Sequence, residues 1–343
     1  KKAKADELWN MFHPYAEWWP GLTNLEYAHL AEITGRVPWS PEVFNCNAPD
    51  TGNMEVFTLF GTDEHKEKYL KPLLDGEIAS AFAMTEPAVA SSDATNVELR
   101  MERDGDEYVL NGRKWFASNA VRPDCKVLIV MGKTDPTAPT HRQQSMMVVP
   151  IDAPGLTILR NLSVFGYVDR ESHGELIFDN VRVPVENLLG EENRGFYQLM
   201  RNLPAERLGI AIHAVAQARR AVDLATSYAH ERKAFGQEIG KFQVNRHALA
   251  QMRVEVDVMQ TYVDQCILDV NSGELTAEEA AGAKWWATET QWKIVDRCLQ
   301  LHGGYGYMNE YEIARLWRDA RVQRIYGGTN EIMLDLIGRK LGF

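Results

Sequence analysis

One acidic residue in the second half of the chain has the chemistry of a general base. Glu206 is followed by Arg207 in a stretch whose apolar spacing is helical. A carboxylate can take a proton from carbon when it is positioned within hydrogen-bond reach of its target. A Glu–Arg pair is also common on the solvated face of a helix, and these residues reveal neither burial nor a target. The pair alone therefore favours a surface role, and nothing local marks Glu206 as a base.

Three other segments carry residue types that suit ligand binding. Residues 300–307 are rich in glycine, which lets backbone approach a phosphate closely. Residues 85–93 follow a predicted strand and contain small hydroxyl side chains that could bind a phosphate or a carbonyl. Residues 114–119 place two aromatic side chains near a hydroxyl, and an aromatic ring can stack on a flat cofactor. Taken singly, the first segment is more typical of a helix–helix turn, the second of a polar turn and the third of a core strand.

The elements that must position these residues form three regions. Residues 1–80 read as helices and loops, with Thr62 placed to cap a helix. Residues 81–190 contain short apolar runs bounded by turn residues, which predicts an antiparallel sheet or barrel. Residues 191–343 have a helical period and a capping box at Thr276, which predicts an antiparallel bundle of three or four long helices. The expected fold class is α+β. One helix face is predicted from Leu249, Met252, Val256, Met259, Val263 and Ile267.

Composition excludes several functional classes. The 343 residues carry a formal charge of -11, so the basic excess typical of a nucleic-acid-binding protein is absent. The four cysteines are far apart in the sequence, which argues against a zinc or disulfide framework and for reduced thiols. No apolar run reaches the length of a membrane span, and neither nucleotide-binding glycine signature is present. Because the chain begins Lys-Lys-Ala-Lys, we expect the natural N-terminus to lie further upstream.

Seven motifs in order and spacing make the chain resemble the acyl-CoA dehydrogenase family over nearly its whole length. The C-terminal half is most similar to long-chain acyl-CoA dehydrogenases, and the N-terminal helical domain resembles one that lacks its first helices. The motifs are Met84-Thr85-Glu86-Pro87, Trp115-Phe116-Ala117-Ser118-Asn119, Val181-Arg182-Val183-Pro184, Leu189-Gly190-Glu191-Glu192-Asn193-Arg194-Gly195-Phe196, Arg232-Lys233-Ala234-Phe235-Gly236, Gln300-Leu301-His302-Gly303-Gly304 and Ile325-Tyr326-Gly327-Gly328-Thr329-Asn330-Glu331-Ile332.

This resemblance implies a helical domain over residues 1–80, a β domain over 81–190 and a four-helix bundle over 191–343, with FAD between the last two. It implies that Phe116 packs on the flavin, with Ser118 near its N5 atom. The region from Phe82 to Ser92 would line the flavin and the substrate carbonyl. The other cofactor residues that it implies are Met84, Thr85, Arg232, Phe235, Gln243, Gln300, Gly303, Gly304, Thr329 and Glu331. Those from Arg232 to Gly304 would reach the FAD of a neighbouring subunit, so a dimer or tetramer is expected.

The resemblance also indicates which carboxylate is the base. Many family members place the catalytic Glu directly before the Gly-Thr of the last motif, where this chain has Gly327. A long-chain and isovaleryl-type subgroup places it before the Arg of the first bundle helix, where this chain has Glu206. One carboxylate is needed at the substrate α-carbon, and two would repel each other. We therefore expect Glu206 to take the α-proton, with Arg207 near the substrate and the Gly327 N–H on its carbonyl.

The expected reaction is the α,β-dehydrogenation of a fatty acyl-CoA to the trans-2-enoyl-CoA, as in fatty acid β-oxidation, with the β-hydride passing to the flavin. By the same resemblance the electron acceptor is an electron-transferring flavoprotein, and the compartment is the bacterial cytoplasm or the mitochondrial matrix. A flavin-dependent oxidase or monooxygenase, or a catalytically silent FAD-binding homologue, are the alternatives. The family's glycine-rich stretch after Thr-Glu-Pro is replaced here by residues 88–92, so either Ser91 or Ser92 could meet the substrate.

Overall fold

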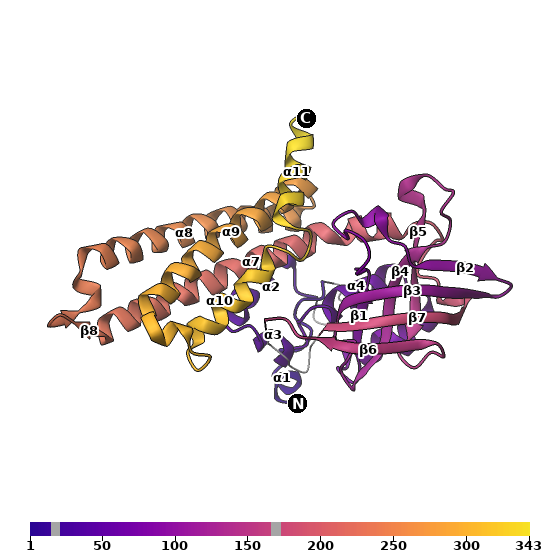
Figure 1. Ribbon diagram of the computed structural model, residues 1–343, viewed down its shortest axis with the longest axis horizontal. Helices are drawn as coiled ribbons and strands as arrows, with labels where there is room; N and C mark the ends of the chain where they lie inside the picture. The colour runs from indigo at the N-terminus through magenta and orange to yellow at the C-terminus, as the bar shows by residue number, and fades with distance from the viewer. Residues whose placement is uncertain (15–20, 166–172) are drawn as a thin grey trace. The chain divides into compact units, whose positions relative to one another are not determined.

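A computed structural model of the chain describes residues 1–14, 21–165 and 173–343 (Figure 1). The chain divides into two compact units. The first comprises Lys1–His13 and Phe44–Asn202, and the second comprises Pro14–Val43 and Leu203–Phe343. Helices and a curled sheet are both present, so the expected α+β class is confirmed. Within the described ranges, no helix combines the length and apolar character needed to cross a membrane.

A seven-stranded sheet forms the centre of the first unit. Its strand order is β1-β4-β2-β3-β7-β6, and β5 pairs with β4. The strands are β1 (Ala79–Ala83), β2 (Arg100–Asp104), β3 (Glu107–Ser118), β4 (Cys125–Lys133), β5 (Gln144–Pro150), β6 (Leu156–Leu162) and β7 (His173–Pro184). Their inward side chains, among them Met101, Leu110 and Leu128, form one buried apolar cluster.

The sheet departs from the sequence prediction in two places. Most pairs are antiparallel as predicted, but β2 meets β4 in parallel at Arg100 and Lys133. In addition, β1 pairs with β4 in parallel, with Phe82 opposite Ile129. The segment between these strands contains β2 and β3, and so long a connection permits the parallel arrangement. Residues 175–178 and 181–184, which read as two of the short runs in the range 81–190, form one strand, β7. Asn180 lies between them at φ +51°, where the β3–β7 register shifts as in a β-bulge.

Short helices complete the first unit. They are α1 (Lys2–Ala5), α4 (Asp50–Phe60), α5 (Asp63–His65) and α6 (Lys71–Leu74), with a π-helical turn at Lys66–Leu70. Thr62 caps α5 as predicted, because its hydroxyl accepts a hydrogen bond from the His65 N–H at 3.2 Å. The α4 helix packs on β1, where Asn53 donates to the Ser80 hydroxyl at 2.9 Å.

The second unit is a helical bundle. Its long helices are α7 (Gly195–Glu231), which enters this unit at Leu203, α8 (Gln243–Ser272), α9 (Ala277–His302) and α10 (Glu312–Gln323). They run beside one another in Figure 1. The remaining elements are α2 (Asn24–Gly35), α3 (Ser40–Val43), α11 (Asn330–Lys340) and the hairpin of β8 (Lys233–Ala234) and β9 (Gln237–Glu238). Small side chains on α7, including Ala214, Ala218 and Ala221, are fully buried and let the helices approach closely.

The predicted bundle signals are confirmed. On the α8 face Leu249 is half-buried and the others are buried: Met252, Val256, Met259, Val263 and Ile267. Helix α8 ends at Ser272, and Gly273 follows in the left-handed conformation at φ +77°. Thr276 and Glu279 form the expected capping box at the start of α9. The helical spacing of apolar residues in the sequence was sufficient to predict the bundle, because each helix buries one continuous apolar face.

A buried ion pair connects the sheet to the loop that follows β1. Glu86 and Lys114 are both buried, and their Oε1 and Nζ atoms lie 2.7 Å apart. The Glu86 carboxylate also accepts the backbone N–H groups of Glu98 at 2.7 Å and Leu99 at 2.9 Å. Lys114 donates a second hydrogen bond to the Met84 carbonyl at 2.8 Å. Both charges are therefore compensated, and the segment 84–86 is fixed against β3.

Replacing Lys114 by Met should strongly destabilise the protein, because it leaves the Glu86 carboxylate buried without its cation. Breaking a buried pair in this way typically costs about 3–5 kcal/mol. Thermal or urea unfolding of Lys114→Met measures the loss, and Lys126→Met, which changes an exposed lysine of β4, is the control. Equal stability of the two variants would show that the pair does not stabilise this unit.

Candidate functional site

The turn of α7 that carries Glu206 contacts the loop before α11. Arg207 is buried, and its Nε donates to the Gly327 carbonyl at 3.2 Å. The adjacent Glu206 side chain is exposed in the isolated chain. The structure therefore brings together three of the residues expected at the substrate: Glu206, Arg207 and Gly327.

The pKa of Glu206 is raised to about 7 from its ordinary value. Desolvation by the surrounding protein is the main cause, and the neighbouring Arg207 opposes it by favouring the charged form. Solvent reaches this carboxylate even though much protein surrounds it. A carboxyl group with such a pKa is partly ionised near neutral pH, which suits proton abstraction.

The loop before α11 cannot easily accept a carboxylate of its own. Gly327 and Gly328 lie in the left-handed region, at φ +66° and +91°. A Cβ added at Gly327 would lie 2.6 Å from the Ile210 side chain, and one at Gly328 would lie 2.7 Å from that of Met333. A glutamate at position 327 would therefore meet both backbone strain and a steric contact. A carboxylate at this alternative position would therefore need a strained backbone and a shift of the Ile210 terminal methyl group.

Thr329 and Glu331 follow directly on this loop. The Thr329 hydroxyl caps α11 by accepting the Ile332 N–H at 3.4 Å, while Glu331 is exposed in the first turn. The hydroxyl of Thr329 thus has a structural partner already, and its oxygen keeps a proton to donate to a ligand.

The other expected cofactor residues of the bundle lie near the far end of α7. Arg232 is placed over the Tyr305 ring, 5.4 Å from its centroid, in the glycine-rich turn that follows α9. Counting 26 residues along a helix at about 1.5 Å each puts Arg232 about 39 Å from Glu206. Gln300 lines a hollow of about 410 Å³ together with Asn245 and Arg297. The residues exposed at this end include Arg232, Phe235, Gln243, Gln300, Gly303 and Gly304.

The expected cofactor residues therefore form two separate groups in the bundle. Thr329 and Glu331 belong with Glu206, whereas the group from Arg232 to Gly304 belongs to the opposite end. One ligand bound at a single place on this unit cannot contact both groups.

The first unit brings its own expected residues together. The Trp115 N–H donates to the Thr85 carbonyl at 2.9 Å, so the segment after β1 lies beside the end of β3. Phe116 has φ +51°, and 46% of its surface is exposed beside the ring of Trp115. Ser118 shares a 2.8 Å hydrogen bond with His173 Nδ1. Phe82, Met84 and Thr85 are all half-buried in the same region.

These residues fit a flat, polar-edged cofactor such as FAD. Trp115 Nε1 is buried and has no hydrogen-bond partner in the described part of the chain. An exposed aromatic ring on a strained left-handed backbone is costly unless something covers it. The orphaned Trp115 donor and the Phe116 ring thus point to a ligand at this edge.

The two candidate serines differ in their surroundings. Ser91 Oγ accepts the Glu86 N–H at 3.1 Å and so stabilises its own loop, whereas Ser92 is exposed. Ser92 is the better candidate for a substrate contact.

Sequence reasoning missed two polar residues beside these groups. His173 contacts Ser118 because the antiparallel β3–β7 register places them opposite each other. Lys284 is buried under the Gly327–Gly328 loop. Neither belongs to a local motif, and only the pairing of distant segments reveals them.

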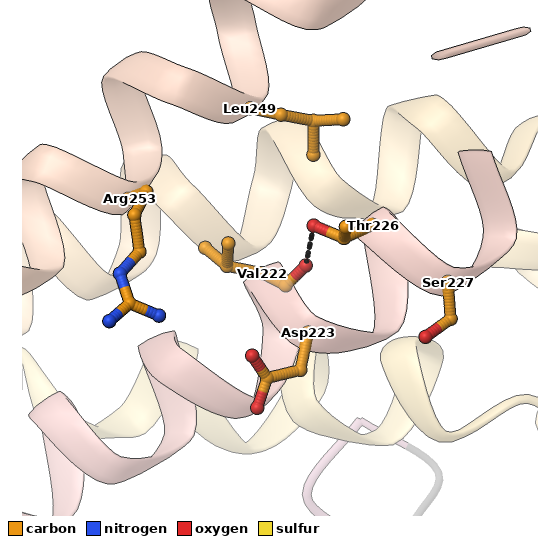
Figure 2. A pocket seen from close by; sticks show the side chains of 6 residues that line it. All are labelled: Val222, Asp223, Thr226, Ser227, Leu249 and Arg253. Atoms are coloured by element: carbon orange, nitrogen blue, oxygen red, sulfur yellow. Dashed lines mark hydrogen bonds between the residues drawn. The ribbon is translucent and has the colours of Figure 1, made fainter. Parts of the chain in front are cut away.

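A second hollow lies on the bundle away from Glu206. Figure 2 shows its lining side chains, with four residues of α7 facing Leu249 and Arg253 of α8. Its volume is about 570 Å³. Asp223 is already paired with Arg36, and the Thr226 hydroxyl donates to the Val222 carbonyl at 2.7 Å. Asp223, Thr226 and Arg253 have internal partners, and this hollow contributes nothing to the site described above.

Sequence profiles of one enzyme family match most of the chain. The profile of the acyl-CoA dehydrogenase middle domain matches residues 81–181, and that of the C-terminal domain matches residues 193–342. The probable acyl-CoA dehydrogenase FadE2 of Mycobacterium tuberculosis is 45% identical over 98% of this chain and 83% of its own length. Acyl-CoA dehydrogenase family member 11 of Gallus gallus is 41% identical over 98% of this chain, which spans 44% of that relative.

Solved structures agree with these matches. The acyl-CoA dehydrogenase of Geobacillus kaustophilus has a TM-score of 0.80 and 36% identity over 96% of this chain and 93% of its own. The prolyl acyl carrier protein oxidase AnaB has a TM-score of 0.89 and 28% identity over 100% of this chain and 89% of its own. The fold therefore occurs in an oxidase as well as in dehydrogenases.

The strained backbone of Phe116 predicts an unusual order of stability. Glycine normally destabilises a strand relative to alanine, but at φ +51° it relieves a cost of about 1–2 kcal/mol. Phe116→Gly should therefore unfold at a higher temperature than Phe116→Ala, by roughly 2–4 °C in the chain without added flavin. Val109 of the same strand is the control position. There Val109→Ala should unfold at a higher temperature than Val109→Gly, which is the usual order. An alanine variant more stable than the glycine variant at position 116 would contradict the strain.

Proposed function

Because the chain belongs to the acyl-CoA dehydrogenase family, we propose that it oxidises a fatty acyl-CoA between its α and β carbons. The product is the trans-2-enoyl-CoA, and Glu206 is the base. One combination of features supports this most directly. The pKa of Glu206 is raised, and the loop before α11 has glycine at the alternative base position. That complementary pattern leaves one carboxylate for the α-carbon.

In this proposal each residue of the site has one task. Glu206 removes the α-proton, and the charge that develops on the thioester oxygen is stabilised by the Gly327 N–H. Arg207 fixes the loop through the Gly327 carbonyl and favours the ionised form of Glu206. Ser92 contacts the acyl-CoA.

The residues present fit FAD as the cofactor. FAD, when bound, supplies the two-electron acceptor that side chains lack. Phe116 provides an aromatic surface. Ser118, the buried indole N–H of Trp115, Thr329 and Glu331 provide polar contacts. The group from Arg232 to Gly304, about 39 Å from Glu206 along α7, serves the cofactor of a neighbouring copy. The active protein is then at least a dimer, and an electron-transferring flavoprotein accepts its electrons.

Replacing Glu206 by Gln should remove the base without removing the cofactor. A positioned base contributes about 10²–10⁴ in rate, so flavin bleaching by an acyl-CoA should slow by at least that range. FAD content and melting temperature should match those of the unaltered chain. Glu278→Gln, which changes a half-buried acid in the first turn of α9, is the control. Unchanged bleaching by Glu206→Gln would refute its role as base.

The pH profile should report the same carboxyl group. The protonated form cannot accept the α-proton, so kcat/KM should fall as the pH drops through about 7 and level off above it. Stopped-flow bleaching across this range measures the profile. A rate that does not change for about two pH units on either side of 7 would exclude a base with this pKa.

An oxidase is the second candidate, and the likeness to AnaB favours it. In an oxidase the reduced flavin reacts rapidly with oxygen, whereas a dehydrogenase transfers its electrons to a protein acceptor. Oxygen consumption during turnover with an acyl-CoA separates the two. Rapid consumption at the rate of substrate oxidation would replace the dehydrogenase by the oxidase.

A further inference from the structure

Lys284 is a fully buried lysine that the proposed reaction leaves without a role. It lies on α9, and its Nζ donates to the Gly328 carbonyl and to Asn330 Oδ1, both at 2.8 Å. Both partners are neutral oxygens. Removing an ammonium group from water is expensive, and neutral partners compensate less than a carboxylate would. A methionine would fill similar space without that cost, so the charge calls for an explanation beyond packing.

The partners of Lys284 are themselves fixed. Asn330 Nδ2 donates to Thr288 Oγ1 at 3.0 Å and to Glu289 Oε1 at 2.9 Å. Glu289 also accepts Arg324 Nε at 2.7 Å, which anchors the network to the end of α10. Lys284 therefore projects from a rigid polar framework. The geometry allows little movement of its ammonium group relative to α9.

This framework holds a loop that contains two adjacent glycines. Gly327 and Gly328 are adjacent glycines, which lose more conformational freedom on folding than any other residue. Arg207 binds the first carbonyl and Lys284 binds the second. Because a peptide unit is planar, fixing these two oxygens also fixes the N–H groups of Gly328 and Thr329. Two cationic donors from two helices thus fix the two peptide units that follow the Gly327 N–H. The peptide unit of that N–H is joined to them at the Gly327 Cα, so they constrain its position through the backbone.

We propose that Lys284 is a positioning residue that fixes the Gly327–Gly328 loop so that its N–H stabilises the enolate form of a bound thioester. The inference rests on the proposed dehydrogenase function. Lys284 touches neither the substrate nor the reacting atoms. It acts through the backbone of Gly328, and its loss should weaken binding of the enolate more than binding of the ground state.

The test compares Lys284→Met with the flavin-loaded, full-length wild type. Two ligands of the acyl length that bleaches the wild type are titrated by flavin absorbance. One is a 3-ketoacyl-CoA, which can bind as its enolate, and the other is an S-alkyl-CoA thioether, which has no carbonyl. Deleting one donor of this kind costs about 10²–10³ in kcat, so a displaced donor should cost about 10–10². We expect that loss in kcat and in 3-ketoacyl-CoA affinity, with KM and thioether affinity nearly unchanged.

A second readout does not depend on turnover. Loss of a hydrogen bond from a charged donor should speed amide exchange of residues 326–330 by about tenfold or more in the flavin-loaded chain. Lys293→Met is the matched control, because Lys293 is an exposed lysine on the same helix. If Lys284→Met does not fold, Lys284→Gln, which keeps an N–H donor but no charge, replaces it.

The outcomes separate this inference from the proposed function. Equal loss of affinity for both ligands, or unchanged enolate affinity together with unchanged amide exchange, would overturn the positioning role. If no acyl-CoA bleaches the wild type, the dehydrogenase proposal fails. In that case the exchange data still decide whether Lys284 holds the loop, and unchanged exchange overturns the inference.

Discussion

The hydrogen bond from Arg207 to the Gly327 carbonyl is the contact on which the rest of the candidate site depends. It connects the helix turn that carries the proposed base to the loop that carries the proposed carbonyl donor. A base and a donor can serve one enolate only if their separation is fixed, since catalysis requires both groups at the reacting atoms together. The small buried side chains of α7 allow the close helix packing that keeps this contact in place.

The first unit follows the same principle with a different interaction. There the buried Glu86 carboxylate, Lys114 and the N–H groups of Glu98 and Leu99 fix the segment after β1. Glu86 belongs to the Met84–Pro87 motif, which indicates a functional role by resemblance. All of its hydrogen bonds nevertheless join it to other groups of the protein. Its task is to place the neighbouring Thr85 beside Trp115. In both units a buried charge fixes backbone, and the exposed neighbours are left for ligands.

A feature could be predicted from the sequence when the residues that cause it lie close together in the chain. The caps at Thr62 and Thr276 and the buried face of α8 follow from residues a few positions apart, and these predictions are confirmed. The parallel β1–β4 pair was missed because strand partners are chosen by the whole sheet. Local residues did not distinguish Glu206 from a surface glutamate, and its assignment came from family resemblance. The burial of Lys284 depends on a loop 44 positions away in the chain, so no local sequence pattern predicts it.

The most direct test of the central claim is an anaerobic titration of the FAD-loaded chain with acyl-CoAs of increasing chain length. The absorbance of the oxidised flavin is followed throughout. If Glu206 and the Gly327 loop act together on a thioester, one length class will bleach the flavin stoichiometrically and will identify the substrate class. Retention of full absorbance with every fatty acyl-CoA, in protein that has FAD bound, would contradict the account.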